Sequence, residues 1–319
     1  MNNYYNKLQG IVKPPLRAVK YQCLYWLAKQ KCLYRQTKND NQPIAFIIGC
    51  GRSGTTILGN ILSQHSQISY FFEPYHLWAN IDMQTDVLNL YHSGDASLLM
   101  NASNVSKASR KRFNQLFQPK FHNQLVLEKT PLNALRLGYL NTIAPKAKFI
   151  HLVRDGVDVS HSIARLAITN RYQITGKPNL NQWWGVNHSK WNALVRDGVK
   201  AGYYSDEISS LQTETSKGAY EWLVTLNEVN RWKSALKERF LELSYETLIT
   251  NPESTLKQLF QFLEINVSSE WLQQSTYTID INRHSRNDSM NLPLKMCQDF
   301  NEYQQQYGFT KRATSNKSN

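Results

Sequence analysis

The sequence predicts an α/β protein with a P-loop-containing three-layer fold, in which a mostly parallel central sheet of about five strands carries helices on both faces. Five short apolar runs recur along the chain with helical periodicity between them, an alternation typical of parallel sheets. The first run, IAFIIG, leads into a glycine-rich turn and then a helical pattern. With 319 residues, 41% of them hydrophobic, the chain is long enough to bury a sizeable core.

The predicted strands are the apolar runs at residues 44–49, 69–72, 125–127, 149–153 and 240–243. TTILGNILSQH follows the first strand and predicts a helix packed on the sheet, because its apolar residues fall on one stripe. PESTLKQLFQFLE predicts a later helix over residues 252–264, with Asn251 as its cap and Pro252 in its first turn. Residues 170–216 lack clear periodicity, which indicates a functional insertion.

The charge is uneven along the chain. The net charge is +13, and residues 1–40 contain eight Lys or Arg residues against one acid, Asp40. This balance points to anionic partners. We divide the chain into a basic N-terminal helical extension (1–42), a core domain (43–300) and a partly disordered tail (301–319), with disorder expected after Phe309. The extension is read as a helix packed on the core domain, with contact to an anionic membrane surface as the alternative.

Several classes of protein are disfavoured. No stretch approaches the ~20 apolar residues that span a bilayer, and no signal-peptide pattern begins the sequence. The four cysteines form neither a CxxC pair nor a metal-ligand cluster, so we expect no disulfide and no metal site. A cytoplasmic location, with peripheral membrane contact left open, is the expectation. No nucleic-acid-binding motif is present, and we expect no nucleic-acid partner.

Residues 49–56 read GCGRSGTT and connect a predicted strand to a predicted helix, a context in which backbone N–H groups bind phosphate. The spacing from Gly49 to Gly54 copies the nucleoside triphosphate P-loop, yet Thr55 stands where that motif requires lysine. The cation lies inside the loop, at Arg52. This pattern disfavours ATP or GTP hydrolysis and suits a 5'-phosphosulfate, whose leaving phosphate Arg52 and the loop N–H groups would stabilise.

A second strand-to-helix junction, KFIHLVRDGVDVSHSI, places Arg154 at the carboxyl end of a strand, where open α/β sheets bind ligands. Ser162 follows eight positions later, about two helical turns on. A guanidinium and a hydroxyl at this spacing suit a second phosphate. Pairing of Arg154 with a carboxylate such as Asp155 remains the alternative.

Five motifs in order carry a resemblance to a known family: GRSGTT, FEP, EKTP with Asn133, FIHLVRDG with the later serine, and LSYETLITNPESTLKQLFQFLEI. Together they resemble the sulfotransferases that depend on 3'-phosphoadenosine 5'-phosphosulfate (PAPS), closest to the carbohydrate and protein-tyrosine branches. The resemblance covers roughly residues 44–265. It implies that residues 43–300 form a catalytic domain, that PAPS is the donor and 3'-phosphoadenosine 5'-phosphate (PAP) the product without a metal, and that 170–216 lies on the acceptor side.

The resemblance also implies roles for individual residues. The 5'-phosphosulfate would bind Gly51, Arg52, Ser53, Gly54, Thr55 and Thr56, and Arg154 and Ser162 would hold the 3'-phosphate, with Tyr245 near the nucleotide. Glu73, in FEP, corresponds to the general base, and Lys129, in EKTP, to the residue that stabilises the transferring group, with Arg52 as the third catalytic residue. His76 is the alternative base, whereas Glu128, His151 and His161 are expected to be structural.

Two departures and several alternatives stay open. Val157 stands where many relatives have arginine, and Arg283, Arg286 and Lys295 are the candidates for closing a C-terminal loop over the 3'-phosphate. A nucleotide kinase, a polyanion-binding protein that is not an enzyme, and a sulfotransferase fold that has lost its chemistry are the competing interpretations. The acceptor hydroxyl, whether of a sugar, glycolipid, small alcohol or tyrosine, and the oligomeric state stay undetermined.

Overall fold

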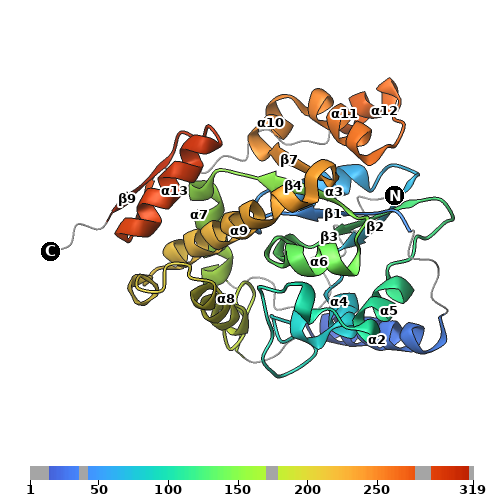
Figure 1. Cartoon of the computed structure of the whole chain (residues 1–319), viewed down its shortest axis with the longest axis horizontal. Coiled ribbons are helices and arrows are strands. Elements are labelled where there is room, and N and C mark those ends of the chain that lie inside the picture. The colour runs from blue at the N-terminus through green and yellow to red at the C-terminus, as the bar shows by residue number, and fades with distance from the viewer. Residues whose placement is uncertain (1–13, 36–41, 170–178, 277–288, 316–319) are drawn as a thin grey trace.

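The structure, a computed structural model, describes residues 14–35, 42–169, 179–276 and 289–315 (Figure 1). A five-stranded sheet lies at its centre, in the order β2-β3-β1-β4-β7, and every neighbouring pair of strands is parallel. Its strands are β1 (Ile44–Ile48), β2 (Ile68–Phe72), β3 (Leu125–Lys129), β4 (Lys148–Val153) and β7 (Phe240–Ser244). The predicted fold class is confirmed, and each predicted strand lies within two residues of an observed one.

Helices cover both faces of this sheet, because its strands are apolar on both sides. All five residues of β1 are buried. Phe46 packs into the cluster on one face and Ile47 into the cluster on the other. Figure 1 shows the two layers. One contains α3 (Thr55–Leu62), α10 (Tyr245–Thr250), α11 (Pro252–Leu263) and α12 (Ser269–Thr276), and the other contains α4 (Tyr75–Ile81), α5 (Lys107–Leu116) and α6 (Leu137–Ile143).

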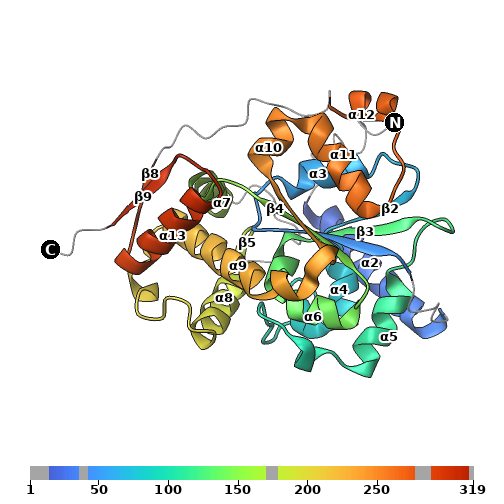
Figure 2. The ribbon, with the colours of Figure 1, turned by 45° about the horizontal axis from the view of Figure 1, so that its top comes forward.

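A third cluster of buried residues lies beside the sheet, where Figure 2 shows further helices gathered on the left. Trp184, Trp222 and Phe300 are at its centre, each fully buried. The helices that contribute to this cluster are α7 (Gly156–Thr169), α8 (Ser189–Lys200), α9 (Glu214–Leu236) and α13 (Leu294–Gln306). The short antiparallel pair β5 (Leu180–Asn181) and β6 (Gly185–Val186) lies between α7 and α8 in the chain, and Leu180 belongs to this cluster.

Short 3-10 helices connect several of these elements. They are η1 (Met83–Thr85), η2 (Ala102–Asn104), η3 (Pro131–Arg136), η4 (Ile208–Ser210) and η5 (Lys237–Arg239). The segment η3 directly follows β3 and is buried over its whole length, so it fixes the end of that strand against the core.

Two expectations about irregular structure are wrong. The stretch 170–216 contains a regular helix, α8, which starts after His188 in a left-handed conformation (φ 58°) and therefore lacks the usual Ser, Thr or Asp cap. The tail after Phe309 is ordered over β9 (Arg312–Ser315), which pairs with β8 (Ser289–Leu292). A buried apolar residue, Ala313, and a bond from its N–H to Asn301 hold β9 in place. Residues 316–319 lie outside the described part.

The N-terminal extension contains the helix α2 (Pro14–Tyr34), which contacts α4 and α5. Its residue Ala28 is buried, and Asn80 on α4 donates a hydrogen bond to the Tyr25 carbonyl oxygen at 3.1 Å. Among the described residues, no helix is both long and apolar enough to cross a membrane.

Candidate functional site

The glycine-rich turn connects β1 to α3 through backbone conformations that few residues adopt. Gly54 has φ 93° and Arg52 has φ 75°. A Cβ at Gly54 would lie 2.3 Å from the Tyr245 ring, and one at Gly51 would lie 2.3 Å from the Trp183 ring. Both glycines are therefore required by close packing. The turn leaves the first N–H groups of α3 without intrahelical partners, an arrangement that binds phosphate.

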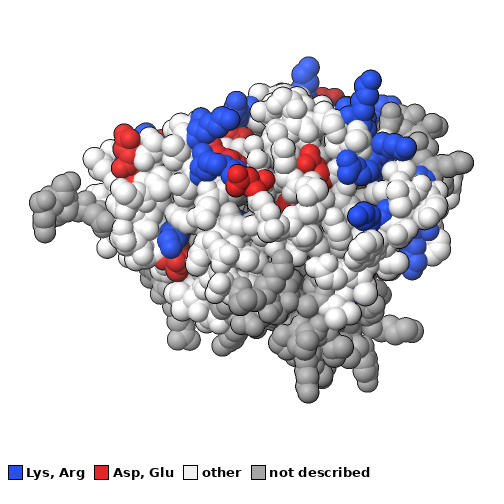
Figure 3. Space-filling view, turned by 90° about the horizontal axis from the view of Figure 1, so that it is seen from below, with Lys and Arg blue, Asp and Glu red and all other residues white. Residues whose placement is uncertain are grey.

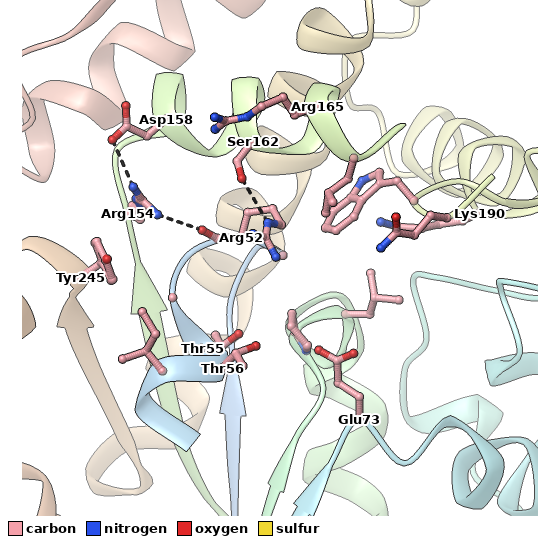
Figure 4. Close-up of a pocket in the computed structure, with 18 of the residues that line it drawn as sticks. Arg52, Thr55, Thr56, Glu73, Arg154, Asp158, Ser162, Arg165, Lys190 and Tyr245 are labelled. Carbon is pink, nitrogen blue, oxygen red and sulfur yellow. Dashed lines mark hydrogen bonds and ion pairs between the residues drawn. The ribbon is translucent and has the colours of Figure 1, made fainter. Parts of the chain in front are cut away.

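A cavity of about 720 Å³ opens over this turn (Figure 4). Of the eleven predicted site residues, nine line this cavity: Gly51, Arg52, Gly54, Thr55, Thr56, Glu73, Arg154, Ser162 and Tyr245. Ser53 is buried under the turn instead, at 1% exposure. The structure thus gathers these residues from four separate stretches of the chain around one cavity.

Arg154 and Ser162 face the turn from β4 and α7, as Figure 4 shows. The Arg154 guanidinium lies 4.3 Å above the Tyr245 ring, donates to the Arg52 carbonyl oxygen at 3.4 Å and pairs with Asp158 at 3.3 Å. Arg52 Nε donates to Ser162 Oγ at 3.1 Å. Two guanidinium groups and a hydroxyl therefore converge on the α7 side of the cavity. The alternative pairing of Arg154 with Asp155 is replaced by pairing with Asp158.

Glu73 lies on another wall of the cavity, and Lys129 is buried directly behind it, outside the cavity lining. Lys129 Nζ lies 2.5 Å from Glu73 Oε1 and 3.0 Å from Thr56 Oγ1, and 4.1 Å from the centre of the Phe72 ring. The Lys129 side chain is fully buried, whereas the Glu73 side chain is 28% exposed and reaches the cavity. Glu73 directly follows β2 with φ 40°, and its N–H donates to the Lys129 carbonyl oxygen. The turn that aims this carboxylate is thereby fixed.

The alternative acid and base residues lie elsewhere. Burial, and then the charge of Lys31, lowers the pKa of His76 to about 4, and His76 is absent from the cavity wall. Glu128 is fully buried and accepts hydrogen bonds from Trp78, Thr130 and Asn133, so it faces away from the cavity as expected. Desolvation raises the pKa of Glu128 to about 7. His151 is buried against Glu242 at 2.8 Å.

Three further residues at the cavity were missed by sequence reasoning. Arg165 follows Ser162 by one helical turn on α7, and this spacing is a signal that was available. Trp183 and Lys190 come from the segment read as an irregular insertion. The Lys190 ammonium lies 4.0 Å from the centre of the Trp183 ring, and both side chains bond to the buried carboxylate of Glu221. The indole is therefore held in place beside Gly51.

Of the three candidates for a loop over the 3'-phosphate, Arg283 and Arg286 lie outside the described residues. Lys295 is exposed on α13, pairs with Asp299 at 2.6 Å and is not among the residues of the cavity wall. Lys311 instead bonds to Asp158, the partner of Arg154. A different cation of the C-terminal segment therefore approaches this side of the site.

The residues present fit a ligand that carries two phosphate groups. The buried Ser53 Oγ has no hydrogen-bond partner within the described ranges, so it is free to serve the phosphate turn. Positive charge comes from three arginines of the cavity wall, Arg52, Arg154 and Arg165. The Tyr245 ring supplies a flat surface beside the turn. Within the same ranges no group of three or more His, Cys, Asp or Glu residues is placed to hold a metal ion.

Comparison with known proteins gives one family. A model described as the sulfotransferase family matches residues 43–203 and 189–269. The solved sulfotransferase STF9 of Mycobacterium avium has a TM-score of 0.51 and 12% identity, covering 91% of this chain and 82% of that one. The sulfotransferase domain of the Synechococcus PCC 7002 olefin synthase has a TM-score of 0.51 and 20% identity, covering 86% and 98%. At these identities the structures support the fold alone.

The matched curated proteins are longer than this chain. The protein-tyrosine sulfotransferase of Drosophila melanogaster is 22% identical over 252 residues, which are 74% of this chain and 48% of that protein. The nodulation protein NoeE of Sinorhizobium fredii is 28% identical over 131 residues, 38% of this chain and 30% of that protein. The chain spans about half the length, or less, of these relatives.

Proposed function

The chain belongs to the sulfotransferase family, and we propose that it transfers a sulfuryl group from PAPS to a hydroxyl group of an acceptor. The observation that carries this proposal is the Glu73 carboxylate, in the wall of the cavity that the phosphate turn and Arg154 also line, with the buried Lys129 ammonium 2.5 Å behind it. This carboxylate and this ammonium would supply the base and the positive charge that transfer to a hydroxyl requires.

The donor would lie across the turn with its two phosphate groups apart. Its 5'-phosphosulfate would bind Gly51 to Thr56 at the start of α3, and its 3'-phosphate would bind Arg154 and Ser162, with Arg165 as an additional cation. Tyr245 packs against Gly54 and lies under the Arg154 guanidinium, a position that suits contact with the nucleotide. Arg52 now bonds to Ser162, so its catalytic role requires its guanidinium to turn toward the leaving phosphate.

The reaction would be an in-line displacement at sulfur. The acceptor oxygen forms the new O–S bond while the bond between sulfur and the bridging phosphate oxygen breaks, and PAP leaves with the electron pair. Glu73 takes the acceptor proton, a step typically worth ~10²- to 10⁴-fold in rate. Lys129, already 3.0 Å from Thr56 in the turn, would stabilise charge on the transferring and leaving oxygens.

The acceptor would enter beside Trp183. The cavity wall includes apolar side chains as well, those of Tyr75, Leu88, Pro131, Leu132, Leu166 and Trp183. We propose that this wall, part of it from the segment 170–216, selects the acceptor. Tyrosine is one candidate, since curated relatives are protein-tyrosine sulfotransferases, and a carbohydrate, glycolipid or small alcohol are the others.

The donor is tested by calorimetric titration with PAP, 5'-AMP and ATP, each with and without Mg²⁺. We expect metal-independent binding that requires the 3'-phosphate, followed by label transfer from PAPS to a panel of hydroxyl acceptors. Binding to Mg-ATP alone would favour the nucleotide kinase. Binding to none of the three, with salt-sensitive binding to polyanions, would favour the polyanion-binding protein.

We also propose a cytoplasmic, reducing location. All four cysteines, Cys23, Cys32, Cys50 and Cys297, lie in the described part of the chain as free thiols. Free cysteines are typical of reducing compartments. Mass spectrometry of alkylated protein from cells would show four modified thiols, whereas a disulfide would contradict this location.

A further inference from the structure

The described side chains of α2 that pack on the rest of the chain lie on one face of the helix. Tyr25 stacks on Tyr91 at 4.9 Å, Ala28 is buried, and Cys32 packs against the cluster under the sheet. These positions are three or four residues apart and so form a single stripe of the helix. At its C-terminal end, Arg35 and Gln115 on α5 exchange hydrogen bonds through their backbone carbonyl groups.

The opposite face of α2 carries large apolar side chains in solvent. Val19, Trp26 and Leu33 recur every seven residues and form one line, with 59%, 56% and 68% of each exposed. Leu27 and Tyr34 lie beside this line, at 59% and 82% exposure. We call these five residues the outer stripe. They account for nearly half of the large exposed apolar residues in the described part of the chain, so they form a patch rather than scattered exposures.

Lysines flank the outer stripe on both sides. At 100° per residue, Lys20 and Lys31 project to one side of the stripe and Lys29 to the other, and Lys29 Nζ lies 5.0 Å from the Trp26 ring centre. Neither α2 nor the sequence before it contains an acid. Exposed lysines of the adjoining α5, Lys107 and Lys111, extend this charge. Seen from below, Lys and Arg side chains gather over the part of the molecule that carries α2 and α5 (Figure 3).

We propose that the outer stripe binds the surface of an anionic lipid bilayer, with Trp26 and Leu33 inserted at the level of the headgroups and the lysines against lipid phosphates. Apolar side chains with Trp and Tyr, flanked by lysines and lacking acids, are the composition of helices that lie in a membrane interface. A second copy of α2 is a poorer occupant, because it would bring two positively charged faces together. This inference rests on α2 alone and holds whichever acceptor the cavity takes.

The test is sedimentation of the full chain with vesicles of phosphatidylglycerol or of phosphatidylcholine. We expect binding to the anionic vesicles that weakens in 0.5 M salt, since the electrostatic part is screened. Leu33→Ser should weaken binding about tenfold, from the loss of one inserted leucine. Lys29→Glu with Lys31→Glu should weaken it by more than about tenfold. Brominated phosphatidylglycerol should quench the tryptophan fluorescence of the wild type more than that of Trp26→Phe.

Matched control variants distinguish binding through the outer stripe from nonspecific binding. Leu294→Ser removes a leucine of similar exposure, 61%, from α13 on the other side of the molecule, and should leave binding unchanged. The double variant Lys200→Glu with Lys257→Glu changes the net charge by the same amount as Lys29→Glu with Lys31→Glu, but at positions outside α2. Equal loss in these controls, or no binding of the wild type to anionic vesicles, overturns the proposal. A dimer in solution that Leu33→Ser converts to monomer overturns it too, because a second copy is then the occupant.

Discussion

Replacing Glu73 with glutamine tests the central pair of the site in two ways. The change removes the carboxylate 2.5 Å from Lys129 and leaves a fully buried ammonium with Thr56 and the Phe72 ring as its remaining partners. Breaking one side of a buried ion pair costs about 3–5 kcal/mol. Because the Glu73 side chain is 28% exposed, we expect the lower end of this range, about 3 kcal/mol, which corresponds to a fall in Tm of about 5 °C.

The ligand dependence of that fall distinguishes the mechanism from simple damage. If the donor phosphate contacts Lys129, PAP supplies the missing negative charge, so the difference in Tm between Glu73→Gln and wild type should shrink to less than about 2 °C when PAP is saturating. Transfer from labelled PAPS should be lost, because the amide cannot take the acceptor proton.

A matched control is the surface pair Lys148–Glu264, at 2.7 Å with the Glu264 side chain 82% exposed. Glu264→Gln should change Tm by no more than about 1 °C. Differential scanning fluorimetry with and without PAP gives all these values. If Glu73→Gln melts like the wild type, the buried-pair argument is refuted. If it transfers sulfuryl groups at a rate similar to that of the wild type, the assignment of the base is refuted.

Three further outcomes are expected. Arg154→Ala should weaken PAP binding about 10- to 100-fold in calorimetry, from loss of charge-assisted bonds, and leave 5'-AMP binding unchanged; unchanged PAP affinity would refute the 3'-phosphate site. Gly54→Ala should abolish PAP binding and lower Tm, because its Cβ meets Tyr245, whereas Gly202→Ala, at similar φ in open space, should keep binding. Burial raises the pKa of Glu128 to about 7, so its contribution to stability is complete below its ordinary pKa near 4.5 and is lost as pH rises through 7. Between pH 5 and pH 8, the free energy of unfolding measured in urea should therefore fall by about 2–3 kcal/mol less in Glu128→Gln than in the wild type. The same pH dependence in both proteins would contradict this.

The fold was predictable from the sequence where a strand is buried on both faces of the sheet. β1 is buried on both faces, so an uninterrupted apolar run identified it without any need for alternation. α8 was missed because His188 begins it in a left-handed conformation and because its residue Lys190 is buried against Glu221. A buried lysine looks polar in a sequence pattern, and only its partner on α9 explains its position.

The site was predictable as far as local motifs reach. The turn, Glu73 and Lys129 each stand in a short motif at a strand end, and parallel strands bring such ends to one edge. Trp183 had no such signal, since its contact with Gly51 joins positions more than a hundred residues apart. Its position depends on Lys190 and Glu221, which the sequence does not relate to the turn.

The contact between Gly51 and Trp183 limits how this protein can be redesigned. The indole that borders the proposed acceptor space also fills the room a side chain at position 51 would need. Exchanging the segment around Trp183 for that of a relative with another acceptor would therefore alter the packing of the nucleotide turn as well. Donor and acceptor preferences are not independent modules here, and a graft that succeeds must carry position 51 and its covering residue together.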